Sequence, residues 1–335
     1  MKHLRSPKIG HLYAVAATML ILSAVLGVLL GATRLNLSDA LSAMLCGDTE
    51  STDLRILLYV RLPRILAGLV AGMALAVSGA VIQGVLMNRL ASPSIIAVKS
   101  GAGLAVTVCS AFGLLGGWRV SLAAFLGAFL SVMLVSIGAK KWGASGGTVI
   151  LMGVALNAIL GAISDAVTAF IPEVSIMRND FRIGDFSAVT YRGVIPAAVL
   201  TVAAVLILVT LAGELDVLTL GDDNARALGL RTDRARVIFL LLSALLAGAA
   251  VSICGLLSFV GLLVPHTVRR LGISESKHLL PLCALFGAGF VTLCDTLART
   301  VLAPYELPVG IIMAFLGAPF FIVILVKGRG GVHHD

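Results

Sequence analysis

Long apolar runs dominate the sequence and constrain the fold more than any other feature. Ten such segments can be separated along the 335 residues, at about 11–32, 62–86, 94–115, 119–138, 148–170, 193–213, 235–254, 256–268, 279–299 and 308–326. A helix that crosses a bilayer needs about 20 mostly apolar residues, and its backbone must be hydrogen-bonded within it because the hydrocarbon holds no water. The runs therefore predict an all-α, polytopic membrane protein with about ten transmembrane helices, forming a single domain over residues 1–335.

Composition argues against the other classes that a basic chain suggests. Hydrophobic residues make up 59% of the chain and charged residues 13%, whereas soluble proteins keep about a quarter of their residues charged. The formal net charge is +8, but the basic residues lie at the ends of the apolar runs and form no continuous basic face. Aromatic residues are only 6%, so a lipid bilayer is the expected partner and nucleic acid is not.

The distribution of Lys and Arg predicts how the chain crosses the membrane. With the N-terminus in the cytoplasm, 15 of the 25 basic residues lie on the inner side, 9 on the outer side and Lys99 within a span. This bias favours a cytoplasmic N-terminus and a cytoplasmic C-terminus. Lys2, Arg5 and Lys8 before the first run resemble the start of a signal peptide. That run is long for one and no clear cleavage site follows it, so a retained helix is expected.

Chemistry-bearing motifs are absent from the sequence. A phosphate-binding loop needs Gly-Lys followed by Ser or Thr, and none of the seven lysines follows a glycine. The five cysteines form no C-x-x-C pair, and no nucleophile–base or paired-carboxylate pattern shares a face. We therefore expect no catalytic residue, no metal site and no cofactor. If ATP drives transport, a separate protein must hydrolyse it.

The long inner loop, at about residues 214–234, has the pattern of short helices. Gly221-Asp222-Asp223-Asn224-Ala225-Arg226-Ala227-Leu228-Gly229 places acidic residues at a helix start and a glycine at its end. One or two short helices on the cytoplasmic face are expected. They are either a solvated amphipathic turn or a contact for an external protein.

Ionisable residues within or beside the spans are expensive and usually face a cavity or a partner. Asp295 and Arg299 are four residues apart and share a helix face, so they form an internal ion pair, an outer-rim site, or both. Lys99 and Asp165 either pair with each other or line a transport path. At the outer end of the second span, Arg61 and Arg64 are either anchors at the lipid headgroups or docking residues.

Five stretches together resemble one family. They are Arg61-Leu-Pro-Arg64; Ser78-Gly-Ala-Val-Ile-Gln83, running on to Asn88 and Ala91-Ser-Pro93; Leu220-Gly221 through Ala225-Arg226 to Gly229; Phe259 to His266 with Arg269-Arg270; and Glu306 to Gly310, continuing to Leu316-Gly-Ala-Pro319. In order and spacing they are similar to the FecCD-type permeases of type II ABC importers, over nearly the whole chain. That family carries iron-siderophores, haem and cobalamin.

The resemblance implies a ten-span permease in the bacterial cytoplasmic (inner) membrane, paired with a second permease copy, as a homodimer or a pseudo-dimer. Two cytoplasmic ATPase subunits would supply energy, and an extracytoplasmic binding protein would deliver the ligand. Docking of that protein is expected at Arg61, Arg64 and Arg299. ATPase coupling is expected at Leu220, Gly221, Asp222, Asp223, Ala225, Arg226, Leu228 and Gly229. Candidates for the translocation path are Gln83, Asn88, Lys99 and Asp165.

The chain departs from the family pattern at three places. Arg89 replaces the usual proline, Lys99 lies in a stretch that is usually Ser-Ser-Gly-Ala, and Asp165 lies in a span that is usually uncharged there. These differences leave the expected fold unchanged and concern the substrate. Two rival functions are kept as alternatives. One is an ion-coupled secondary transporter that uses Asp165, Lys99 and Asp295 as a relay. The other is an intramembrane enzyme, which the missing catalytic patterns disfavour.

Overall fold

The computed structural model describes residues 9–33, 35–48, 50–114, 117–141 and 145–329. All regular secondary structure in these ranges is helical. Four basic residues used in predicting the orientation, Lys2, Arg5, Lys8 and Arg34, lie outside the described residues. The predicted all-α fold is confirmed.

Each of the ten predicted segments corresponds to a helix. They are α1 (Ile9–Leu29), α4 (Leu62–Val85), α5 (Val98–Ala111), α6 (Trp118–Lys141), α7 (Gly146–Phe170), α9 (Tyr191–Thr210), α12 (Thr232–Cys254), α13 (Val260–Arg270), α14 (Ser276–Thr300) and α15 (Val309–Arg329). Within the described residues, seven helices are long and apolar enough to cross a membrane, the second being the continuous run Thr52–Val85. Helices α5 and α13 are shorter.

The two short helices begin where the backbone leaves the right-handed region. Ala97, directly before α5, has φ 66°, and Phe259, directly before α13, has φ 68°. Helix α5 therefore begins four residues later than the predicted segment at 94. Gly255 ends α12 with φ 68°, so α12 and α13 are separate helices joined by a short loop. The eighth predicted segment is thus a short helix of 11 residues, α13.

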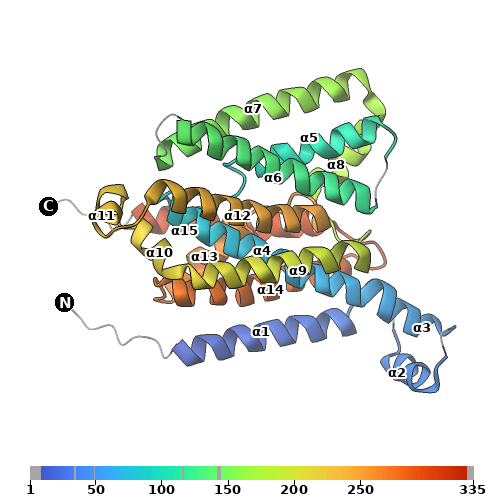
Figure 1. Cartoon of the computed structure of the whole chain (residues 1–335). Coiled ribbons are helices and arrows are strands. Elements are labelled where there is room, and N and C mark those ends of the chain that lie inside the picture. Colours follow the sequence, from blue (N-terminus) through green and yellow to red (C-terminus); the bar gives the residue numbers. More distant parts are fainter. Residues whose placement is uncertain (1–8, 34, 49, 115–116, 142–144, 330–335) are drawn as a thin grey trace.

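Surface helices cover the two ends of the bundle (Figure 1). At one end, here called the α8 end, lie α2 (Leu37–Cys46), α3 (Thr52–Arg55), η1 (Ile56–Arg61), η2 (Pro172–Val174) and α8 (Ser175–Ile183). At the opposite end, called the α11 end, lie α10 (Ala212–Leu218) and α11 (Asp222–Ala227). The short helices predicted in the long loop are thus present, and α1 begins at this same end.

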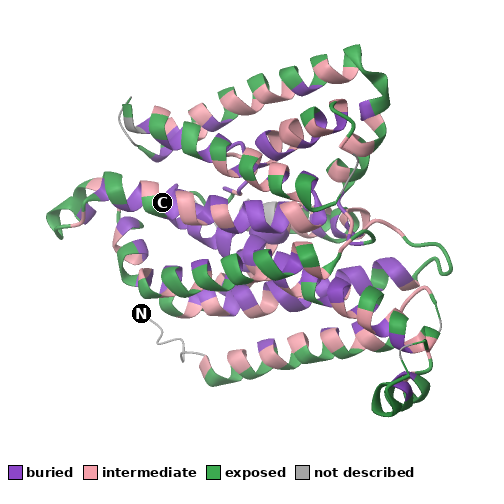
Figure 2. Ribbon diagram, turned by 45° about the vertical axis from the view of Figure 1, so that its right-hand side comes forward, coloured by how far each residue is buried: buried purple, intermediate pink, exposed green. Residues whose placement is uncertain are grey.

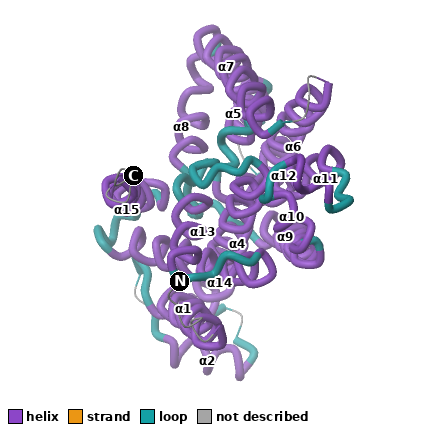
Figure 3. Tube along the Cα trace, turned by 90° about the vertical axis from the view of Figure 1, so that its left-hand side faces the viewer, coloured by secondary structure: helices purple, strands orange, loops and turns teal. Residues whose placement is uncertain are grey.

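Helix α4 is the centre of the bundle and is buried along nearly its whole length. It packs against α12, α13 and α14, while α6 and α5 continue the bundle beyond α12, and α7 and α1 lie at its flanks. Buried residues gather in these central helices and exposed ones on the flanking helices (Figure 2). Seen along the bundle, α15 stands to one side and α7 at the top (Figure 3).

Glycine allows the central helices to approach closely. A Cβ built on Gly79 of α4 would lie 2.0 Å from the carbonyl oxygen of Gly261 in α13. One built on Gly72 would lie 2.1 Å from the carbonyl oxygen of Gly287 in α14. Small residues of this kind bring backbones together where lipid supplies no hydrophobic drive between helices. Because Gly72 and Gly79 are seven residues apart, α14 and α13 approach the same face of α4 at positions about two turns apart.

Candidate functional site

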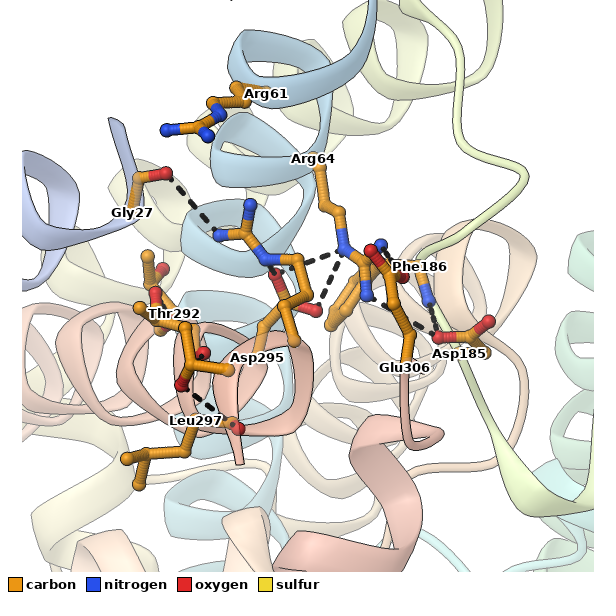
Figure 4. Close-up of polar contacts among 12 residues, drawn as sticks. Gly27, Arg61, Arg64, Asp185, Phe186, Thr292, Asp295, Leu297 and Glu306 are labelled. Carbon is orange, nitrogen blue, oxygen red and sulfur yellow. Dashed lines mark hydrogen bonds and ion pairs between the residues drawn. The ribbon is translucent and has the colours of Figure 1, made fainter. Parts of the chain in front are cut away.

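A buried network of charges lies at the α8 end, and Figure 4 shows its members. Arg64, near the start of α4, donates from Nε to Asp295 Oδ1 at 2.9 Å and to Oδ2 at 3.1 Å. Its Nη1 donates to Glu306 Oε2 at 2.6 Å, and its Nη2 lies 3.7 Å from Asp185 Oδ1. Arg64 therefore joins α4 to α14, to the loop before α15 and to the loop after α8.

Asp295 is shared between two arginines. Its Oδ2 lies 3.1 Å from Arg299 Nε, one helical turn further along α14. The predicted Asp295–Arg299 ion pair is confirmed. Arg299 Nη2 also donates to the carbonyl of Gly27 in α1 at 3.4 Å. Beside them, Arg61 donates to the carbonyls of Val28 and Thr33, at the end of α1 and just after it.

Burial corrects part of the expectation for these arginines. Arg61 is 2% exposed, Arg64 4% and Arg299 3%, so none of them stands free on an outer rim. Asp185 and Glu306 are about a third exposed and form the accessible edge of the network. Three arginines and three carboxylates balance formally, which limits the cost of burying them.

The α11 end carries the segment predicted to couple to an ATPase. Asp222, in the first turn of α11, accepts from Arg236 Nη2 of α12 at 2.6 Å. Arg226 donates from Nε to Thr232 Oγ1 at 3.1 Å and lies 3.8 Å from Asp233. Gly221 and Gly229 on either side of α11 have φ of 94° and 86°, a conformation that glycine adopts most readily.

Two leucines of this segment point away from the protein. Leu220 is 55% exposed and Leu228 is 65% exposed, whereas Ala225 is fully buried. Helix α10 is tied to α14 because Asp216 accepts from the backbone N–H of Ser276 at 3.0 Å and from its hydroxyl at 2.6 Å. The segment thus presents apolar side chains on a base that is bonded to two membrane helices.

Two of the path candidates have structural partners. Gln83 is 3% exposed, donates to the carbonyl of Gly261 at 2.9 Å and accepts from Arg269. It joins α4 to α13 and does not line any cavity described below. Asn88 is exposed in the loop after α4, where its side chain accepts from the N–H of Leu90 at 2.9 Å.

Lys99 and Asp165 do not pair with each other. Lys99 Nζ donates to Ser258 Oγ in the α12–α13 loop at 2.8 Å, while Asp165 accepts from Arg178 of α8 at 2.5 Å. Of the two alternatives, pairing of Lys99 with Asp165 is wrong. Within the described part of the chain, no hydrogen bond or ion pair joins any two of Asp165, Lys99 and Asp295, so the relay of the rival transporter is not assembled.

Lys99 does lie at cavities, as a path residue would. One, of about 200 Å³, is enclosed by α4, α12, α13 and the loop before α5. The other, of about 440 Å³, lies between α5, α7, α8 and the α12–α13 loop. Lys99 and Ser258 line both.

Sequence reasoning missed several residues of these sites. Asp185 and Glu306 lie in loops, and their partner Arg64 is 242 residues from Glu306, so no helical spacing connects them. Asp216 and Arg178 were not singled out as partners either. Asn157 binds the carbonyls of Ser94 and Ile95 from α7. A lone amide within an apolar run was the available signal for it.

Comparison with known proteins agrees with this geometry. The model of the FecCD transport family matches residues 19–327. The uncharacterized ABC transporter permease protein YvrB of Bacillus subtilis is 36% identical, covering 85% of this chain and 83% of the relative. The Hemin transport system permease protein HmuU of Yersinia pestis is 35% identical over 84% and 86%. The Fe(3+)-citrate import system permease protein YfmD of Bacillus subtilis is 33% identical over 95% of both.

A solved structure has the same fold. It is an ABC transporter of the metal-chelate type in an inward-facing conformation, with a TM-score of 0.83 and 28% identity over 96% of this chain and all of that one. The similarity extends over nearly the whole chain, so the arrangement of its helices is that of a known transporter fold. The chain therefore belongs to the FecCD transport family and has the fold of an ABC importer permease.

Proposed function

We propose that this chain is the membrane-spanning subunit of an importer that carries an iron chelate, haem or a corrinoid. Its cargo would arrive from an extracytoplasmic binding protein, and partner ATPases would drive the transport. Support for the cargo class comes from relatives whose names refer to hemin, Fe(3+)-citrate and vitamin B12. The rival ion-coupled transporter loses support because its three charged residues have separate partners.

One observation carries the proposal: the α10–α11 segment exposes apolar side chains and is hydrogen-bonded to two membrane helices. Leu220 and Leu228 offer apolar contact area at the α11 end. Behind them, Asp222–Arg236 bonds the segment to α12, and Asp216–Ser276 bonds it to α14. An external protein can move membrane helices only through a rigid contact, and these two bonds supply one. The coupling residues Leu220, Gly221, Asp222, Asp223, Ala225, Arg226, Leu228 and Gly229 are thus proposed to receive the ATPase.

The experiment is co-purification of the chain with its ATPase, followed by ATP hydrolysis and cargo uptake in proteoliposomes. Leu228→Asp places a charge in the proposed apolar contact and should abolish co-purification. Leu45→Asp is the matched control, since Leu45 is 88% exposed on α2 at the opposite end. Normal co-purification and uptake with Leu228→Asp would refute the coupling role of this segment.

Docking of the binding protein is proposed at the α8 end. Arg64 and Arg299 are already bonded internally. An acidic residue of the partner would reach Arg64 by replacing Glu306 or Asp185, which are about a third exposed. Arg61→Glu, Arg64→Glu and Arg299→Glu should each weaken capture of the binding protein, with a clear salt dependence. If folded variants bind the binding protein as well as the unaltered chain does at every salt concentration, these arginines have a structural role only.

The assembly and orientation follow the family pattern and are part of the proposal. A second copy of this chain, most simply as a homodimer, would form the path between the two subunits. The α11 end, where α1 begins, would face the cytoplasm, with both termini on that side. Protease protection of tags at the two termini in sealed inverted vesicles tests this orientation.

A further inference from the structure

The 440 Å³ cavity beside Lys99 has a cationic wall. Lys99 of α5 lines it together with Arg178 and Arg182 of α8, which are four residues apart and share a helix face. No carboxylate is among its lining residues. Arg178 pairs with Asp165, which does not itself line the cavity. Within the described ranges, no ion pair involves Lys99 or Arg182, so two positive charges remain unbalanced at this cavity.

Lys99 also keeps hydrogen-bonding capacity. An ammonium group has three donors, and among the described residues only Ser258 accepts from Lys99, at 2.8 Å. Helix α5 begins at Val98, directly before Lys99 in the lining of the cavity. The N-terminal end of a helix carries partial positive charge, which adds to that of the side chains.

The wall is held in place by a polar network. Asn157 of α7 donates to the carbonyls of Ser94 at 3.0 Å and Ile95 at 3.3 Å, and its side-chain oxygen accepts from Ser100 at 2.6 Å. These bonds fix the segment before α5 against α7. Gly153 of α7 allows the close approach, because a Cβ there would lie 2.1 Å from the carbonyl oxygen of Ile95. The position of Lys99 at the start of α5 is thus set before any ligand arrives.

We propose that this cavity receives a carboxylate group of the transported cargo, and that the chain accordingly selects carboxylate-bearing chelates over neutral ones. The inference rests on the proposed function and narrows its substrate class. Lys99 contacts the carboxylate directly, and Arg182 attracts it from the exposed side of the cavity. Serine hydroxyls of Ser94, Ser100, Ser164 and Ser258 complete a polar lining. The volume is within the range of small-ligand sites, about 300–1,000 Å³.

The first experiment measures uptake by the full importer in cells or proteoliposomes with three probes. Ferric citrate and haemin both carry carboxylates, and a ferric trihydroxamate is neutral. Lys99→Met should reduce uptake of whichever carboxylate probe is carried, on the order of tenfold for the loss of one charge at close range. Lys277→Met is the matched control, an exposed lysine at the α11 end. Whether ferric citrate or haemin is affected distinguishes the two sources of the carboxylate.

The second experiment reports the charge of the cavity without any cargo or ATPase. Gly161 lines the cavity and has no atom within 4 Å of a built Cβ, so Gly161→Cys places a thiol in open space. It is made in the full chain with Cys46 and Cys109 replaced by serine. Anionic and cationic methanethiosulfonate reagents are then compared. The anionic-to-cationic rate ratio should fall about tenfold when Lys99→Met and Arg182→Gln are added, and Arg192→Gln should leave it unchanged.

The outcomes separate this inference from the proposed function. Import of the neutral chelate alone, or equal loss of all probes with Lys99→Met, would overturn the carboxylate assignment while leaving the importer assignment intact. A rate ratio unaffected by the two substitutions would overturn it as well. Failure of all three probes to enter would count against iron chelates and haem as the cargo. The ratio of the thiol reaction rates would then be the test of the charge in the cavity.

Discussion

Asp295 is the residue whose loss should cost the most stability in the charge network. It is 1% exposed and is the carboxylate shared by Arg64 and Arg299. In Asp295→Asn, Arg64 would keep Glu306 at 2.6 Å and Asp185 at 3.7 Å. Arg299 would keep only the carbonyl of Gly27 at 3.4 Å among the partners described. Most of the lost stability should therefore come from Arg299, which would be buried without a carboxylate partner.

The magnitude follows from the geometry. A unit pair about 3 Å apart at an effective dielectric constant near 20 interacts by about 5 kcal/mol. Removing one partner of a buried pair costs about 3–5 kcal/mol in measured cases. We expect Asp295→Asn to lower the free energy of unfolding by that amount. Adding Arg299→Met removes the stranded cation and should recover about half of the loss or more.

Equilibrium unfolding in mixed micelles, followed by far-UV circular dichroism, measures these free energies. Asp180→Asn is the control, because Asp180 is an exposed carboxylate at the same end of the bundle, and its change should stay within about 0.5 kcal/mol. A loss below about 1 kcal/mol for Asp295→Asn would refute the reasoning. A double variant as unstable as the single one would refute it too.

Three further predictions concern a surface pair, a helix contact and a turn. A double-mutant cycle of Asp165→Asn with Arg178→Gln should give a coupling of about 1 kcal/mol or less, because Asp165 is 69% exposed. A double-mutant cycle of Asp165→Asn with Lys99→Met should give no coupling energy. A clear coupling would contradict the finding that Asp165 and Lys99 have different partners. Gly79→Ala should destabilise by about 1–3 kcal/mol or more, since its Cβ would lie 2.0 Å from Gly261 O. Gly213→Ala, with open space around it, should leave the stability nearly unchanged. Equal thermal midpoints for Gly79→Ala and Gly213→Ala would disprove the close contact of α4 with α13. Gly229→Val forces a β-branched residue to a φ of 86°, at about 1–2 kcal/mol, and should reduce transport per ATP hydrolysed in proteoliposomes. Gly229→Asn should be tolerated, and a Val variant that is coupled equally well would show that the turn geometry is not needed.

Patterns that span a few residues were enough to predict the ten long segments and the short helices of the 214–234 loop, but not the surface helices α2, α3 and α8. Apolar runs indicate the ten helices because bilayer thickness sets their length. The acidic start and glycine end of residues 221–229 predict α11, because caps are local chemistry. The i, i+4 spacing of Asp295 and Arg299 predicts their pair, since both lie on one helix. Each of these inferences needs no knowledge of which helices become neighbours.

Tertiary structure alone decided the partners of the remaining charges. Arg64 and Asp295 are 231 residues apart, and no local pattern relates them. Asp165 pairs with Arg178 and Lys99 with Ser258, although sequence reasoning also allowed Asp165 and Lys99 to pair. Which helices meet depends on close contacts such as Gly79 against Gly261, and those contacts form only when the whole bundle packs. The burial of Arg61, Arg64 and Arg299, and the cationic cavity at Lys99, are consequences of that packing.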